Sequence, residues 1–319
     1  MDKQYVIGID MGGTNTEFGI VDARGSILFR DKIKTGEYED INDYVKALAK
    51  GLSDLIYEAG HDGKIRGIGV GAPNGNFYNG CIEFAPNLPW KGQIALAQLI
   101  SEAMNGIPVA LTNDANAAAI GEMTYGAARG MKNFIEITLG TGVGSGIVIN
   151  GQVVYGHDGF AGELGHVIMR RDNGRLCGCG RHGCLEAYTS ATGVARTARE
   201  FLTGGTEPSL LRDIDAEKIT SKDVYDAAVK GDKVALDIFE ATGKMLGEAF
   251  ADFVAFSSPE AIVVFGGLAN AGKLIMDPIH KSMEANMLKV FQNKVKLIKS
   301  ELPGADAAIL GASALGWEA

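Results

Sequence analysis

The chain has 319 residues, enough for two domains with substantial cores, and its 46% hydrophobic content and mean hydropathy of +0.06 are those of an ordinary soluble globular protein. A net charge of −9, from 39 acidic and 30 basic residues, disfavours nucleic acid as the main partner. There is no N-terminal leader pattern and no apolar run near the roughly 18 residues of a membrane span, and the thiols are clustered. We therefore expect a cytoplasmic protein with no membrane partner.

Strands and helices are predicted to alternate along the chain. The first half is expected to hold strands at 6–9, 17–22, 26–34, 65–70 and 108–111, with helices at 41–59 and 115–125. The second half is expected to hold strands at 134–138, 147–150, 261–265 and 295–299, with helices at 235–255 and 306–317. This alternation predicts an α/β fold with layered sheets.

Two glycine- and threonine-rich turns, about 128 residues apart, each join a pair of predicted strands, which suggests a duplicated architecture. Glycine lets backbone N–H groups approach a nucleotide phosphate, and an aspartate at a strand end can hold a magnesium-bound water. Either turn alone is typical of an ordinary hairpin; the pair, one of them headed by aspartate, favours a nucleotide site. The residues concerned are Asp10, Gly12, Gly13, Thr14, Thr141 and Gly142.

A third glycine turn, Gly266-Gly267, follows the predicted strand at 261–265. The stretch from Gly267 to Lys273 resembles a P-loop, but Leu274 stands where that motif needs a serine or threonine for magnesium. We interpret Gly266 and Gly267 instead as a strand-end turn where an adenosine could lie, with plain packing as the alternative.

Asp114 lies where a predicted strand runs into a helix. A carboxylate there can accept a proton from a substrate hydroxyl, although Asp114 could also be only the N-cap of the helix. Asn113 beside it and Asn87 supply amides of the kind that bind sugar hydroxyls.

Three of the four cysteines, Cys177, Cys179 and Cys184, fall within eight residues. With a histidine they predict a closed tetrahedral Cys3His zinc site, with His166 or His182 as the fourth ligand. Glu163 and Glu186 flank this segment, and such a zinc loop would present their carboxylates to a ligand. The remaining cysteine, Cys81, is assigned to packing.

Together these motifs resemble the ROK family (repressors, open reading frames and kinases) over nearly the whole chain. The resemblance is carried by Asp10-x-Gly12-Gly13-Thr14, by Leu139-Gly140-Thr141-Gly142-x-Gly144, by Glu163-x-Gly165-His166 and by Cys177-x-Cys179-Gly180-x-x-Gly183-Cys184-x-Glu186. The chain departs from the family pattern in the segment Gly71-Ala72-Pro73-Asn74-Gly75. It has Asn74 where glucokinase-type members usually have Gly-Pro.

The resemblance implies an actin-like, ribonuclease-H-like ATPase fold with two domains around a central cleft. We expect a smaller domain at 1–115, joined by a C-terminal helix at about 300–319, and a larger one at 116–299 that carries the zinc loop. Asp114 would be the catalytic base and His166 the fourth zinc ligand. The sugar contacts would be Asn87, Asn113, Asp114, Glu163, His166 and Glu186.

The implied reaction is phosphorylation of a hexose or N-acetylhexosamine at its primary hydroxyl, with Mg-ATP and a structural zinc, by a homodimer. Glucose is favoured, and N-acetylglucosamine or N-acetylmannosamine is the alternative. A sugar-responsive repressor would carry a winged-helix domain before the first phosphate motif, which here begins at Asp10, and a non-catalytic sugar sensor would not need the phosphate turns and Asp114. A sugar kinase is therefore expected.

Overall fold

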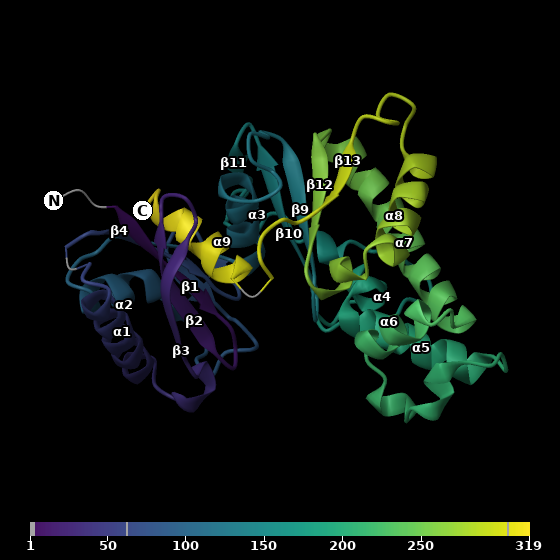
Figure 1. Ribbon diagram of the computed structural model, residues 1–319, viewed down its shortest axis with the longest axis horizontal. Helices are drawn as coiled ribbons and strands as arrows, with labels where there is room; N and C mark the ends of the chain where they lie inside the picture. Colours follow the sequence, from purple (N-terminus) through teal and green to yellow (C-terminus); the bar gives the residue numbers. More distant parts are fainter. Residues whose placement is uncertain (1–3, 62, 305) are drawn as a thin grey trace. The chain divides into compact units, whose positions relative to one another are not determined.

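The computed structural model describes residues 4–61, 63–304 and 306–319. It divides into two compact units (Figure 1). Met1–Lys132, Gly146–Gly162 and Ser300–Ala319 form the first, and Asn133–Ser145 and Glu163–Lys299 form the second. The division differs from the expected boundaries because residues 146–162 and residues 116–132 belong with the first unit. There a Cβ on Gly121 would stand 2.7 Å from the Cα of Gly311, so the two helices that carry these glycines touch through their backbones.

Every predicted strand and helix is present, and further strands and helices that were not predicted lie between them. The strands are β1 (Tyr5–Met11), β2 (Thr16–Asp22), β3 (Ile27–Ile33), β4 (Ile65–Gly71), β5 (Gly75–Asn76), β6 (Cys81–Glu83), β7 (Gln93–Ile94), β8 (Val109–Thr112), β9 (Phe134–Leu139), β10 (Val143–Ile149), β11 (Gln152–Val153), β12 (Ala261–Phe265) and β13 (Lys296–Lys299). The α-helices are α1 (Ile41–Glu58), α2 (Leu96–Ala103), α3 (Asp114–Thr124), α4 (Glu186–Thr189), α5 (Ala191–Gly204), α6 (Ser221–Val229), α7 (Lys233–Ser257), α8 (Lys273–Asn286) and α9 (Ala307–Gly316).

The first sheet has the strand order β3-β2-β1-β4-β8. β1 pairs antiparallel with β2, and β2 with β3, whereas β4 runs parallel to β1 and β8 parallel to β4. Parallel strands need crossover connections, which α1 and the segment containing α2 provide. The carboxyl ends of β1, β4 and β8 therefore meet at one edge of the sheet.

The two faces of this sheet carry residues of different size. Ile7 and Ile9 of β1 enter a core that α1 and α2 share. The alternate residue, Gly8, faces α9, and a Cβ there would overlap the carbonyl oxygen of Ile309. Gly69 of β4 does the same with the carbonyl oxygen of Ala312. Glycine thus brings α9, drawn in yellow beside β1 and β4 in Figure 1, into backbone contact with the sheet.

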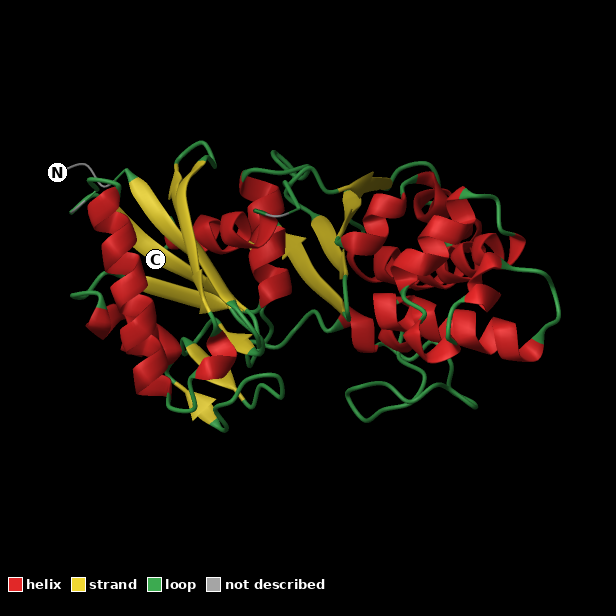
Figure 2. Cartoon of the chain, turned by 60° about the horizontal axis from the view of Figure 1, so that its bottom comes forward, coloured by secondary structure: helices red, strands yellow, loops and turns green. Residues whose placement is uncertain are grey.

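The second sheet has the order β11-β10-β9-β12-β13, with β12 parallel to both β9 and β13. Short strands β5, β6 and β7 form a third sheet in the order β5-β6-β7. Within the second unit α7 packs closely on α8: a Cβ on Gly243 would lie 2.5 Å from Cβ of Pro278, and one on Gly247 2.5 Å from the carbonyl oxygen of Ile279. In Figure 2, helices, drawn in red, make up most of this unit.

The strand predicted at 147–150 begins earlier, at Val143. Gly144 and Gly146, which precede the predicted range, are therefore strand residues. Gly146 is needed there because a Cβ would stand 2.5 Å from that of Ala119 in α3. The turn is therefore only Gly140 to Gly142.

Within the described ranges, no helix is long and apolar enough to span a membrane.

Candidate functional site

The first glycine turn joins β1 to β2 and lies against Asn87. The N–H of Gly12 donates to the carbonyl oxygen of Asn15 at 2.9 Å, which closes the turn. A Cβ on Gly13 would stand 2.5 Å from the carbonyl oxygen of Asn87, so glycine is required for this approach. The N–H groups of Gly13 and Thr14 have no partner among residues that the structure describes, and they are free to bind a phosphate oxygen.

A buried hydroxyl cluster anchors the end of this turn. The Oγ1 atom of Thr16 lies 2.8 Å from that of Thr35 and 2.9 Å from the hydroxyl of Tyr44 in α1. Thr35 and Tyr44 were not predicted as site residues. The available signal was the chemistry of Tyr44 itself, because a tyrosine on the inner face of a helix needs a buried partner for its hydroxyl.

Asp10 lies near the carboxyl end of β1. Burial, repulsion from Asp114 and repulsion from Glu17 together raise the pKa of Asp10 to about 6. The strand register explains the proximity of the two aspartates: Asp10 pairs with Gly71 of β4, where a Cβ would lie 3.7 Å from the Cα of Asp114. The two carboxylates thus belong to one site at this edge of the sheet.

Asp114 is the first residue of α3, and Asn113, rather than Asp114, is its N-cap. The Oδ1 atom of Asn113 accepts a hydrogen bond from the N–H of Asn116 at 2.7 Å. The predicted N-cap was therefore wrong by one residue, because the extended backbone of β8 continues through Asn113. Asp114 Oδ1 accepts from the N–H of Ala115 at 2.9 Å, and burial raises the pKa of Asp114. A carboxyl group with a raised pKa is a competent proton acceptor near neutral pH.

The second glycine turn lies in the second unit, between β9 and β10. The N–H of Gly140 donates to the carbonyl oxygen of Gly142 at 3.0 Å. The N–H groups of Thr141 and Gly142 have no partner in the described part of the chain, as in the first turn. The next N–H, that of Val143, donates to Oε2 of Glu186 at 3.0 Å.

Residues at the start of α5 also donate hydrogen bonds to this second glycine turn. The N–H of Ala191 donates to the carbonyl oxygen of Gly140 at 2.8 Å, and the hydroxyl of Thr192 donates to that of Thr141 at 3.0 Å. These contacts were not predicted, because α5 was not predicted. Ser190, the N-cap of α5, was the available signal for that helix.

Gly266 follows β12 with a φ of 100°, a conformation that favours glycine. A Cβ there would overlap the carbonyl oxygen of Leu139, at the end of β9, so the third turn lies beside the second. Gly267 then begins a short 3₁₀ helix, Gly267–Ala271. This position suits an adenosine next to the phosphate turn, and it is equally explained by packing.

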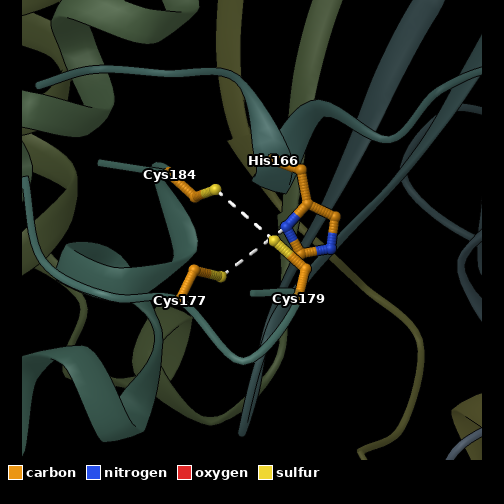
Figure 3. A group of neighbouring side chains, drawn as sticks. All are labelled: His166, Cys177, Cys179 and Cys184. Atoms are coloured by element: carbon orange, nitrogen blue, oxygen red, sulfur yellow. Dashed lines mark hydrogen bonds between the residues drawn. The ribbon is translucent and has the colours of Figure 1, made fainter. Parts of the chain in front are cut away.

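The four predicted metal ligands converge on one point (Figure 3). Their ligand atoms all lie within 4.8 Å of one another. The Sγ atoms of Cys179 and Cys184 are 3.7 Å apart, and Sγ of Cys177 is 3.8 Å from Nδ1 of His166. Zinc–sulfur bonds of about 2.3 Å in a tetrahedron place the sulfur atoms about 3.8 Å apart, so these residues fit a zinc ion.

His182, the other candidate for the fourth ligand, lies outside this group. Its Nδ1 atom is 3.0 Å from the carbonyl oxygen of Gly174. His166 points Nδ1 at the cysteines and has its Nε2 atom 4.0 Å from Oε2 of Glu163. One ring nitrogen therefore faces the metal position and the other faces a carboxylate predicted to bind the sugar.

The structure therefore brings the predicted site residues together in two groups. The group in the first unit is Asp10, Gly12, Gly13, Thr14, Asn87, Asn113 and Asp114. The group in the second unit is Thr141, Gly142, Glu163, His166, Cys177, Cys179, Cys184, Glu186, Gly266 and Gly267. Each group combines a glycine turn that has free N–H groups with polar side chains suited to a polyol.

Comparisons with known proteins agree with this chemistry. A glucokinase of Halalkalibacterium halodurans is 37% identical over 321 aligned residues, which cover 99% of this chain and 95% of that protein. The crystal structure of a ROK family glucokinase from Streptomyces griseus in complex with glucose and AMPPNP superimposes with a TM-score of 0.81 at 34% identity, covering 99% of this chain and all of that one. The fold is therefore the actin-like ATPase fold of these sugar kinases.

Relatives of another class also align. A xylose repressor of Bacillus spizizenii is 28% identical over 98% of this chain, which spans 76% of the repressor's length. The sequence profile of the ROK family matches residues 6–318 of this chain. On this match, and on its likeness to the glucokinases, the chain belongs to the ROK family.

Proposed function

We propose that this protein transfers the γ-phosphoryl group of ATP to the primary hydroxyl of a hexose, and that glucose is the preferred acceptor. The observation that carries the proposal is the carboxyl group of Asp114, which is held at the start of α3 beside Asp10 and whose pKa is raised by desolvation. The likeness to glucokinases supports the choice of glucose.

Asp114 would act as the general base. Its Oδ1 is occupied by the N–H of Ala115, and Oδ2 is available to accept the proton of the sugar hydroxyl. Desolvation raises the pKa of this carboxyl group, so it accepts a proton from the hydroxyl more readily than an aspartate of ordinary pKa would.

Asp10 and the two glycine turns would bind Mg-ATP. Mg²⁺ neutralises charge on the phosphates when it is bound. The N–H groups of Gly13, Thr14, Thr141 and Gly142 point to no other partner among described residues, and they would bind the phosphate oxygens. Gly12, Gly266 and Gly267 would shape the nucleotide site without donating directly.

The sugar would be bound by Asn87, Asn113, Glu163, His166 and Glu186 together with Asp114. Asn113 uses its side-chain oxygen to cap α3, which leaves its amide NH₂ group to donate to a sugar oxygen. The Nε2–H of His166 would donate in the same way when Nδ1 binds a metal.

His166, Cys177, Cys179 and Cys184 would hold a structural zinc ion. Four protein ligands fill a tetrahedral site and leave no position for a reacting water, so these residues would stabilise the loop rather than take part in phosphoryl transfer. N-acetylglucosamine or N-acetylmannosamine is the alternative acceptor, and a homodimer is the proposed assembly.

A coupled assay of ADP production with Mg-ATP tests the proposal against a panel of sugars: glucose, mannose, N-acetylglucosamine and N-acetylmannosamine. We expect the highest kcat/KM with glucose, and a phosphorylated product at the primary hydroxyl by NMR. A protein that binds glucose and ATP but turns over none of these sugars would instead be a sugar sensor. Preference for an N-acetylhexosamine would establish the alternative kinase.

A further inference from the structure

Val143, the first residue of β10, directly follows the second glycine turn and is held on two sides. Its N–H donates to Oε2 of Glu186 at 3.0 Å. Its carbonyl group packs on Gly165, where a Cβ would overlap the carbonyl oxygen of Val143. The peptide groups on both sides of this residue are thus fixed by segments distant in sequence.

The carboxylate of Glu186 fits this position closely. A Cβ on Gly142 would stand 2.5 Å from the same Oε2 atom, so glycine lets the carboxylate lie against the turn. A hydrogen bond from a backbone N–H to an ionised carboxylate is stronger than a neutral one. Glu186 therefore fixes where the turn ends and β10 begins.

Both segments that hold Val143 also carry metal ligands. Gly165 precedes His166 directly, and the N–H of Leu164 donates to the hydroxyl of Ser145, two residues beyond Val143, at 3.1 Å. Glu186 lies two residues after Cys184, and its Oε1 atom is 3.3 Å from Sγ of Cys177. A metal ion bound by the His/Cys cluster would join the two segments and hold them around Val143.

We propose that Glu186 is a positioning residue for the nucleotide, and that through it the His/Cys cluster fixes the second phosphate turn. The N–H groups of Thr141 and Gly142 immediately precede Val143. Their directions depend on the anchored peptide, and they need a fixed direction to bind phosphate oxygens. The inference rests on the proposed binding of ATP, and it gives Glu186 a role besides that of a sugar ligand.

The test compares Glu186→Ala with Glu186→Gln in the full, zinc-loaded chain. Binding of a non-hydrolysable ATP analogue with Mg²⁺ is measured by calorimetry in the absence of sugar. We expect about ten-fold weaker binding for Glu186→Ala, since a hydrogen bond to a charged group is lost. Glu186→Gln keeps an oxygen that can accept from Val143, so its affinity should stay within about three-fold of the unsubstituted protein. Glu248→Ala, an alanine substitution of a glutamate that faces Arg170, is the matched control and should not change nucleotide affinity.

Hydrogen exchange at Val143 provides a second readout that does not depend on activity. Exchange should be faster in Glu186→Ala, and equally faster when a chelator removes zinc, whereas Glu186→Gln should remain protected. Equal nucleotide affinity and exchange in Glu186→Ala and the unsubstituted protein would overturn the inference. If Glu186→Ala does not fold, the same two measurements are made on the unsubstituted protein after a chelator has removed zinc. Unchanged nucleotide affinity and unchanged exchange at Val143 in that protein would overturn the inference. An unsubstituted chain that binds no nucleotide would refute the proposed function instead.

Discussion

Replacement of Asp114 by asparagine should separate catalysis from stability. Asparagine has the same shape, and its side-chain oxygen can still accept from the N–H of Ala115. The substitution removes the base, so kcat should fall by about 10²- to 10⁴-fold while the KM for the sugar changes little. The stability of the fold should instead rise, because the charge of Asp114 repels that of Asp10.

The size of the stability change follows from Asp10. Its pKa of about 6, against 3.8 for an ordinary aspartate, is a rise of about two units, which is about 3 kcal/mol of destabilisation when the group is ionised at neutral pH. Burial is the largest cause, and the charge of Asp114 is the second. Removing that charge relieves part of this cost and should stabilise the fold by about 1 kcal/mol at pH 7.5.

The sign of the pH dependence is also fixed. A carboxyl group whose pKa is raised by folding stabilises the folded state below its unfolded pKa, and this contribution is lost as the pH rises through the folded value. The increase in the free energy of unfolding caused by Asp114→Asn should therefore be present at pH 7.5 and become smaller toward pH 4.

The assays are initial rates of sugar phosphorylation and thermal melting at both pH values. Asp252→Asn, the same substitution at an exposed position on α7, is the control and should alter neither quantity. Near-normal turnover of Asp114→Asn would refute the role of Asp114 as base. A lower melting temperature at pH 7.5 would show that its carboxylate stabilises the fold.

Other predictions concern pH, metal, packing and assembly. The kcat/KM for Mg-ATP should fall as the pH drops below about 6, because protonated Asp10 no longer attracts Mg²⁺, and this decline should be smaller in a pH–rate profile of Asp10→Asn. Elemental analysis should find about one zinc per chain, and this zinc should be lost in Cys179→Ser but retained in Cys81→Ser. A metal-free protein with a normal KM for the sugar would contradict the structural role of zinc. Gly69→Ala should lower the free energy of unfolding by about 3 kcal/mol in urea titrations, because its Cβ overlaps the carbonyl oxygen of Ala312, whereas Gly204→Ala, which meets no atom within 4 Å, should be neutral. Light scattering at micromolar concentration should give a homodimer, and a monomer would overturn that proposal.

The regular strands and long helices could be predicted from residue periodicity. β12 has the predicted bounds, and α1 differs from its predicted range only at its last residue. The beginning of β10 could not be predicted in this way, because glycines such as Gly144 and Gly146 are typical of turns. Their role in the strand depends on the close approach of Ala119, a contact between segments that local sequence does not reveal.

The candidate site was similarly predictable in part. The His/Cys cluster follows from ligand chemistry, and the choice of His166 over His182 came from the family resemblance; the structure places His166 in the cluster. The hydrogen bond between Glu186 and Val143 joins positions 43 residues apart, and no spacing rule relates them. Sequence thus identified which residue types matter, but not which backbone groups they hold.

The position of α9 has a consequence for how the chain is made. The first unit begins with β1, yet Gly8 and Gly69 on one face of its sheet contact α9, which follows the whole second unit in sequence. During synthesis the strands of the first unit emerge early and keep an open face of backbone until α9 is available. The second unit can fold before α9 is synthesised. The first unit, whose strands are translated first, can therefore finish folding only after the second unit has been made.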